Sequence, residues 1–136
     1  MNELYIPEDL VSVYAGIKKH IVKVIGTKTE TETFFYQIKF PSGEVQYADK
    51  DNIVPIPLIP EILEKNGWYG VTHSKQSDDN TKILYKTFKR NGYPTIKVSQ
   101  DLKITCELSP FIVKLESVSD LQHLLFGLDI ENEMEV

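Results

Sequence analysis

Five side chains within one segment combine positive charge with aromatic rings, a pairing that can hold phosphates and stack bases. They lie in residues 83–100, where Asn91-Gly92 between two β-rich runs predicts a hairpin with a two-residue type I′ turn. The register that follows places all five on one face. The sequence therefore predicts a site for an anion or a nucleic acid at Lys86, Phe88, Arg90, Tyr93 and Lys97.

The same register sets Lys86 directly opposite Lys97, a like-charge contact that is unfavourable unless negative charge lies over it. The other face of the hairpin, which includes Tyr85 and Val98, is predicted to be the core side. In an alternative interpretation the cations are solvated, or are paired internally with Glu107 or the acidic C-terminal residues.

Other residue types that could do chemistry are scattered along the chain. His20, His73 and His123 lack the spacing of a metal site, and no phosphate-binding Gly-rich loop or nucleophile-elbow motif occurs. The single cysteine, Cys106, excludes an internal disulfide, and its alternation with Ile104 predicts that it is buried. We therefore expect no metal, no cofactor and no enzymatic activity.

The charge of the chain is unevenly distributed. Of its 136 residues, 41% are hydrophobic and 26% are charged, which suffices for one domain or two small ones. A net charge of −5 argues against a generally basic nucleic-acid binder. However, the last eight residues contain four acids and no base, whereas residues 82–103 contain six bases and one acid. The hairpin segment can therefore have a positive potential of its own.

No membrane span or export signal is predicted. Glu3, Glu8 and Asp9 make the N-terminal residues acidic, and no long apolar run follows them. The most apolar stretch, residues 53–59, is short and contains two prolines, so it cannot span a bilayer. We expect a cytoplasmic protein with no membrane partner.

The N-terminal half is predicted to be a small β-structure. Residues 20–25, 34–40 and 44–48 are strand candidates, residues 53–54 form a short closing strand, and residues 27–33 form a loop or mobile hairpin tip. This order, with its Phe-Pro-Ser-Gly-Glu turn at residues 40–44, resembles an SH3-like or Tudor-like small barrel. Such barrels mostly bind peptides, modified side chains or nucleic acids. The resemblance implies ligand-facing aromatic residues at Tyr14, Phe35 and Tyr47, although aromatic residues at strand spacing are also typical of a core.

The C-terminal half is predicted to contain two helices around a β-meander. Pro60 suits the first position of a short helix and Gly67 its C-terminal cap, whereas Ile59 is a poor N-cap. Five strands are then expected at residues 68–72, 83–89, 93–98, 102–107 and 111–115. A second helix begins at a capping box, Ser119-x-x-Gln122, or at the alternative cap Ser117, and its apolar stripe is expected to pack on this sheet. On that helix, a structural or surface role is expected for His123.

These patterns predict an α+β, β-rich fold. Its expected parts are an SH3-like small barrel at residues 1–58, a connecting helix at 59–67, an antiparallel sheet with a packed helix at 68–128, and a flexible acidic tail at 129–136.

Two further motifs resemble a known group of proteins. Ile56-Pro57-Leu58 precedes a helix that ends Lys65-Asn66-Gly67-Trp68, and residues 118–128 read Val-Ser-Asp-Leu-Gln-His-Leu-Leu-Phe-Gly-Leu. Together they are similar to uncharacterised proteins common in Bacteroidetes genomes, their prophages and mobile elements. The resemblance implies a small accessory protein of phage or mobile-element type. We therefore predict a non-enzymatic protein-interaction module with a protein partner, and as the alternative a nucleic-acid-binding accessory protein that uses the hairpin face.

Overall fold

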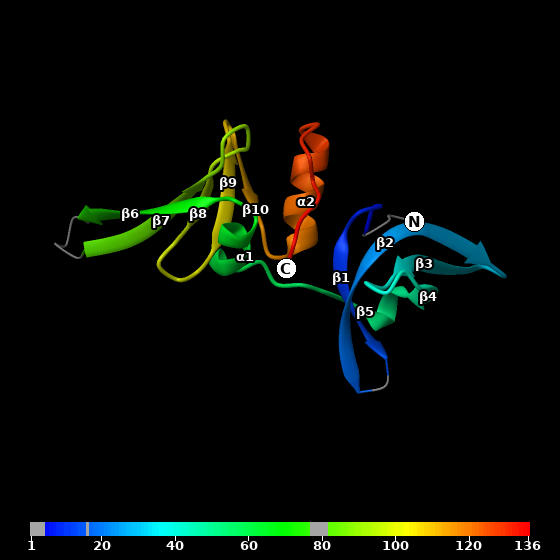
Figure 1. Ribbon diagram of the computed structural model, residues 1–136. Coiled ribbons are helices and arrows are strands. Elements are labelled where there is room, and N and C mark those ends of the chain that lie inside the picture. The colour runs from blue at the N-terminus through cyan, green and yellow to red at the C-terminus, as the bar shows by residue number, and fades with distance from the viewer. Residues whose placement is uncertain (1–4, 16, 77–81) are drawn as a thin grey trace. The chain divides into compact units, whose positions relative to one another are not determined.

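The chain forms two compact units (Figure 1). The computed structural model describes residues 5–15, 17–76 and 82–136. The first unit comprises Met1–Pro57 and Ser117–Met134, and the second comprises Leu58–Glu116 and Glu135–Val136. Within the described residues, each unit contains one five-stranded antiparallel sheet and one α-helix. The fold is therefore β-rich with two helices, in agreement with the predicted α+β class.

The sheet of the first unit has the strand order β4-β3-β2-β1-β5. Its elements are β1 (Leu10–Ala15), β2 (Lys18–Glu30), β3 (Thr33–Lys39), β4 (Val45–Asp49), the 3-10 helix η1 (Lys50–Asn52) and β5 (Ile53–Pro55). The sequence-based prediction omits β1, which pairs with β2 on one side and with β5 on the other. β1 therefore joins β5 to the rest of the sheet.

Residues 27–33, for which the sequence predicts a loop or a mobile hairpin tip, form the end of a long hairpin. β2 and β3 pair as far as Glu30 and Thr33, which leaves a two-residue turn at Thr31-Glu32. Both turn residues have positive φ, 49° and 66°, as a type I′ turn requires. Of the two predicted alternatives, the hairpin is therefore confirmed, because the polar residues are hydrogen-bonded to the neighbouring strand.

The core of the first unit lies against one face of this sheet. The rings of Tyr5 and Tyr36 meet edge to face with centroids 5.3 Å apart, and Phe34 contacts Tyr36 in the same way at 5.0 Å. The buried residues of this cluster are Tyr5, Val11, Val13, Val22, Val24, Tyr36, Ile38, Ala48 and Ile53.

Helix α2 (Val118–Gly127) belongs to the first unit, in contrast to the predicted boundaries, which place it with the second sheet. Ser117 caps the helix and forms a capping box with Asp120, so the alternative cap is the one used. The helix contacts β1, and the buried amide of Gln122 bonds the backbone of Leu10. These polar bonds link α2 to β1, and periodicity alone could not identify that partner.

The acidic C-terminal residues are held by hydrogen bonds, whereas the sequence suggests a flexible tail. In the first unit, the carbonyl O of Asn132 accepts from Gln122 (3.0 Å) and Met134 is buried. In the second unit, the backbone N–H of Glu135 donates to Asn66 Oδ1 (2.7 Å), and Lys65 Nζ donates to the carbonyl O of Val136 (2.8 Å). The charge pattern does not reveal these backbone contacts.

The second unit is a helix followed by an antiparallel meander, as predicted. Helix α1 (Pro60–Lys65) begins without a side-chain cap at Ile59 and is followed by Gly67 with φ 93°. The strands are β6 (Tyr69–Gln76), β7 (Lys82–Lys89), β8 (Ile96–Val98), β9 (Ile104–Leu108) and β10 (Phe111–Lys114), in the order β10-β9-β8-β7-β6.

The β7–β8 hairpin is shifted by one residue from the predicted register. Phe88 pairs with Ile96, whereas a two-residue turn would set it opposite Thr95. Gly92 has φ 81° but Asn91 is not in the positive-φ region, so the turn is not type I′. Because opposite residues share a face, the shift moves Phe88 to the side of Ile96 and Val98. Burial of a phenyl ring outweighs the local preference of Asn-Gly.

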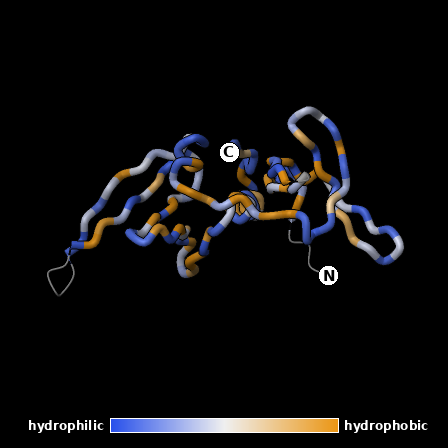
Figure 2. The backbone as a smooth tube through the Cα atoms, turned by 90° about the horizontal axis from the view of Figure 1, so that it is seen from below, coloured by the Kyte–Doolittle hydropathy of each residue, from blue (hydrophilic) through white to orange (hydrophobic). Residues whose placement is uncertain are grey.

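The shifted register gives the second sheet a buried inner face. Phe88, Ile96 and Cys106 are fully buried there, and Val98 and Ile104 are nearly so. Gly70 permits this packing, since a Cβ at that position would come within 2.9 Å of the Phe88 ring. Hydrophobic and hydrophilic residues alternate along the strands (Figure 2), as expected for a sheet buried on one side. None of the helices in the described residues is long and apolar enough to span a membrane.

Candidate functional site

The structure divides the five residues that were predicted to form one binding face. Phe88 is fully buried, so the prediction that it lies on an open surface is wrong. Lys86 pairs with Val98 and Lys97 pairs with Thr87, which places the two lysines on opposite faces of the sheet. The predicted like-charge contact between Lys86 and Lys97 is therefore also wrong. Both errors follow from the one-residue shift in register.

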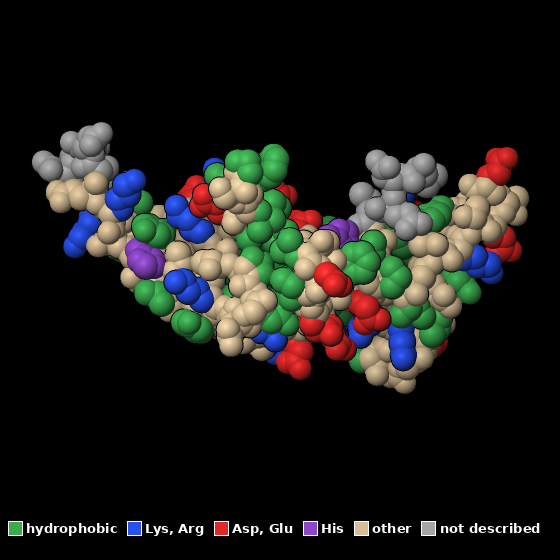
Figure 3. All heavy atoms as spheres, turned by 90° about the horizontal axis from the view of Figure 1, so that it is seen from above, with side chains coloured by type: hydrophobic (Ala, Val, Ile, Leu, Met, Phe, Trp, Pro, Cys, Tyr) green, Lys and Arg blue, Asp and Glu red, His purple; other side chains and the backbone are tan. Residues whose placement is uncertain are grey.

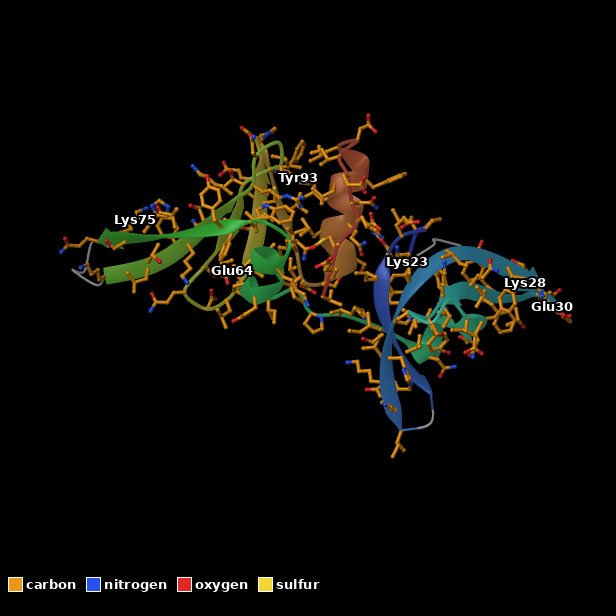
Figure 4. The ribbon with its side chains drawn as sticks, viewed as in Figure 1. Lys23, Lys28, Glu30, Glu64, Lys75 and Tyr93 are labelled. Atoms are coloured by element: carbon orange, nitrogen blue, oxygen red, sulfur yellow. The ribbon has the colours of Figure 1, made fainter. Side chains whose placement is uncertain are left out.

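Arg90 and Tyr93 remain together, but they contact each other. The Cζ atom of Arg90 lies 3.9 Å from the centroid of the Tyr93 ring and 5.1 Å from that of Trp68. Trp68 is buried, and its Nε1 donates to the carbonyl O of Pro94 (3.4 Å). Figure 4 labels Tyr93 in this cluster. Arg90 therefore contacts aromatic rings of its own unit, which is neither the predicted open face nor the pairing with Glu107 or the C-terminal acids that the sequence suggests as the alternative.

Lys86 lies beside acidic side chains. It lines a groove of about 400 Å³ together with Glu61 and Glu64 of α1, and Glu64 is labelled on that helix in Figure 4. Carboxylates in the same groove reduce the positive potential around Lys86. This side of the sheet is therefore a poor site for an anion.

The opposite side of the second sheet, which we call the outer face, combines rings and cations. The rings of His73 and Tyr85 stack with centroids 5.0 Å apart and planes 18° apart. Lys97 Nζ lies 4.7 Å from the centroid of the Tyr85 ring. His73 Nε2 is hydrogen-bonded to Thr87 Oγ1 (2.9 Å), which fixes the orientation of the imidazole. Three neighbouring strands, β6, β7 and β8, thus contribute to one cluster.

Strand register defines the members of the outer face, none of which is buried. Among the described residues they are Tyr69, Val71, His73, Lys75, Ile83, Tyr85, Thr87, Lys89, Lys97, Thr105, Glu107, Ile112 and Lys114.

Lysines exceed acids on the outer face. Lys75, Lys89, Lys97 and Lys114 are exposed, and Glu107 is the acidic member of the set just defined. None of these lysines forms a salt bridge with another described residue. Figure 3 shows Lys and Arg side chains interspersed with hydrophobic ones on the second unit, and Figure 4 places Lys75 near the tip of the β6–β7 hairpin. Such a surface attracts anions even though the whole chain is acidic.

The three aromatic residues implied by the small-barrel resemblance do not gather at one place. Tyr14 is 55% and Tyr47 is 50% exposed, whereas Phe35 is half-buried. Tyr14 pairs with Lys19, but Phe35 pairs with Lys28, which lies about 30 Å further along β2. Lys28 Nζ also lies 4.7 Å from the centroid of the Tyr47 ring, near the end of β2 in Figure 4. Phe35 and Tyr47 therefore lie near the same lysine, and Tyr14 lies apart.

A buried polar network in the first unit connects α2 to the segment before β1. Asp9 is fully buried; its Oδ2 accepts from the backbone N–H of Ile6 (2.9 Å) and also contacts His123 Nε2. Gln122 is fully buried, accepts from the N–H of Leu10 (2.8 Å) and donates to the carbonyl O of Glu8 (2.7 Å). His123 therefore has a structural role, as its sequence context suggests.

The environment of His123 changes its titration. The hydrogen bond to Asp9 raises its pKa above the ordinary 6.5, burial opposes this shift, and the charges of Asp9 and Asp120 add to the rise. The charged imidazole is thus favoured in the folded state. Its contribution to stability is complete below the ordinary pKa and is lost as the pH rises through the raised pKa.

We expect His123→Gln to reduce the pH dependence of stability. The free energy of unfolding of the wild type should fall as the pH rises above about 6.5 and through the raised pKa of His123, because the folded protein releases the imidazole proton there. The variant should be less stable near pH 6 and should show a flatter profile, as measured by urea unfolding followed by far-ultraviolet circular dichroism. His20→Gln, which changes another histidine of the first unit, should keep the wild-type slope. Equal slopes in all three proteins would contradict the assignment.

The remaining chemical groups have structural surroundings. Cys106 is buried as predicted, and burial raises the pKa of its thiol. Residues 5–15, 17–76 and 82–136 contain no group of three or more His, Cys, Asp or Glu side chains placed to hold a metal ion.

Comparison with protein-family models, with curated proteins and with solved structures found no match to this chain. Functional inference therefore rests on the residues themselves.

Sequence reasoning missed His73 and Tyr85 as members of a possible site. The predicted register assigns Tyr85 to the core side, and β6 was expected to end at residue 72. Alternation of His73 with Val71 and Tyr69 is the signal that could have extended the strand. Of the predicted site residues, only Lys97 is on the outer face.

Proposed function

We propose that this protein is a non-enzymatic accessory protein that binds nucleic acid through the outer face of its second sheet. The observation that supports the proposal most strongly is the segregation of four exposed lysines and three aromatic rings on one sheet face of a chain with net charge −5. Lysines attract phosphates, and rings offer stacking surfaces for bases. A ligand that has both groups matches both features of the face.

The two faces of the β7–β8 hairpin offer a matched test in which two lysines are removed from each face. Lys89→Ala/Lys97→Ala removes two cations from the outer face, and Lys82→Ala/Lys86→Ala removes two cations from the other side of the sheet. We expect only the first pair of substitutions to weaken binding, about ten-fold or more. Each lysine that no longer contacts a phosphate also removes the counterion release that favours binding. Fluorescence anisotropy with labelled DNA and RNA across a salt series should show a slope shallower by about 1.5.

The matched pair separates a local site from the effect of net charge, since both variants lose the same charge. Equal weakening by the two pairs would contradict a site on the outer face. Absence of binding at low salt would reject nucleic acid as the ligand altogether.

A second candidate function is protein interaction through the first unit. The strand order β4-β3-β2-β1-β5, with η1 directly before β5, supports the inference that this unit is an SH3-like small barrel. Its exposed Tyr14 and Tyr47 support contact with a protein partner. The resemblance of residues 56–68 and 118–128 to phage and mobile-element proteins supports an accessory role for either function. A negative result in the nucleic-acid titration would favour this candidate.

A further inference from the structure

We infer that the nucleic acid held by the outer face is single-stranded and that its bases stack on two aromatic positions of the β6–β7 pair. This inference rests on the proposed function above and names the class of its ligand.

The first aromatic position is Tyr69. Its side chain is 60% exposed, and it lies directly opposite Lys89 at the start of β6. The Tyr69 ring contacts no other ring and no cation among the described residues. A base can therefore reach the ring without displacing a neighbour, and Lys89 is placed to meet the adjoining phosphate.

The second aromatic position is the stacked pair His73 and Tyr85. The imidazole of His73 is held in one orientation before any ligand binds, by its hydrogen bond to Thr87 and by its stacking on Tyr85. Little side-chain entropy is therefore lost on binding. Lys97 Nζ lies over the Tyr85 ring, so a base stacks on the His73 side of the pair and Lys97 adds positive charge nearby. Because His73 lies four residues after Tyr69, the two positions are about 13 Å apart along the strand.

The exposed rings favour a single strand over a double helix. In a duplex the bases are stacked on one another and present only their edges in the grooves. The rings of the outer face stack on the planes of bases that are already unstacked, which is the usual situation in a single strand.

The rings also distinguish a nucleic acid from an acidic peptide. Carboxylates can pair with Lys89, Lys97 and Lys114, but they offer no aromatic ring that can stack on Tyr69. A chain of nucleotides supplies a charge and a planar ring at every repeat. An acidic peptide is therefore the competing ligand that the experiment must test.

Tyr69→Leu is the decisive variant, with Tyr69→Phe as its matched control. Anisotropy titrations would use labelled DNA and RNA strands of about 12 nucleotides, the duplex of the same sequence, an abasic strand of equal length, and a polyglutamate of equal charge. We expect the single strand to bind at least about ten-fold more tightly than the duplex or the abasic strand. Tyr69→Leu should lose about ten-fold in single-strand affinity with an unchanged salt slope, whereas Tyr69→Phe should retain wild-type affinity.

The outcomes separate this inference from the proposed function. If Lys89→Ala/Lys97→Ala weakens binding but the duplex binds as tightly as the single strand, the inference is wrong and the proposed function stands. The same conclusion follows if Tyr69→Leu binds like the wild type. Equal affinity for polyglutamate would overturn both, as would failure of every nucleic acid to bind.

Discussion

Phe88→Ala should lower the free energy of unfolding of the second unit by about 3–5 kcal/mol, the largest stability effect that we expect in this protein. Phe88 is fully buried on the inner face, pairs with Ile96 and packs its ring against Gly70. Truncation removes the transfer free energy of the ring and leaves a cavity that a sheet backbone can fill only partly. Trp68, the single tryptophan, is buried in the same unit, so its fluorescence during urea unfolding reports this transition.

Phe111→Ala is the matched control, because it deletes the same side chain from the same sheet. Phe111 is 70% exposed, so its truncation should change stability by no more than about 0.5 kcal/mol. The contrast also tests the register of the hairpin. In the register of a two-residue turn, Phe88 would lie on the open side, and the two variants would then have similar stabilities.

Gln122→Leu should cost about 2–4 kcal/mol in the first unit. The buried amide accepts from the N–H of Leu10 and donates to the carbonyl oxygens of Glu8 and Asn132. Leucine has a similar size but leaves these backbone groups without that partner, and an unsatisfied buried group costs about 1–3 kcal/mol. Urea unfolding followed by circular dichroism measures the loss. Amide hydrogen exchange should show faster exchange at Leu10 in particular.

Gln46→Leu provides the comparison for the same substitution on the surface. Gln46 is exposed and its amide bonds only to the side chain of Glu44 in the described structure, so its replacement should be nearly neutral. If Gln122→Leu were as stable as Gln46→Leu, the network would not be what attaches α2 to β1.

Local sequence signals correctly predicted the elements whose partners are adjacent in the chain. The short helix at Pro60 and the order of the five strands in the second sheet depend on caps, turns and alternation within a few residues. The burial of Cys106 also follows from alternation within its own strand. These features were predictable because neighbouring residues decide them.

Predictions that depended on turn type were wrong. Asn91-Gly92 predicts a type I′ turn, yet the positive φ values that such a turn requires occur at Thr31-Glu32. In both hairpins the strand pairing fixes the register, and the turn residues adapt to it. The predicted binding face was divided for this reason, and the stacked pair His73 and Tyr85 was missed.

By itself, the sequence determined the β-rich α+β fold class of this protein, the positions of most strands and the concentration of basic residues near the β7–β8 hairpin. Only the tertiary structure decided which face those residues occupy and which unit receives α2. The physical reason is the same in both cases. In each case the deciding contact is one that no local pattern encodes. A one-residue shift exchanges the two faces of a strand at little local cost, so burial of Phe88 selects the register, and the hydrogen bond of Gln122 with the backbone of Leu10 links α2 to β1.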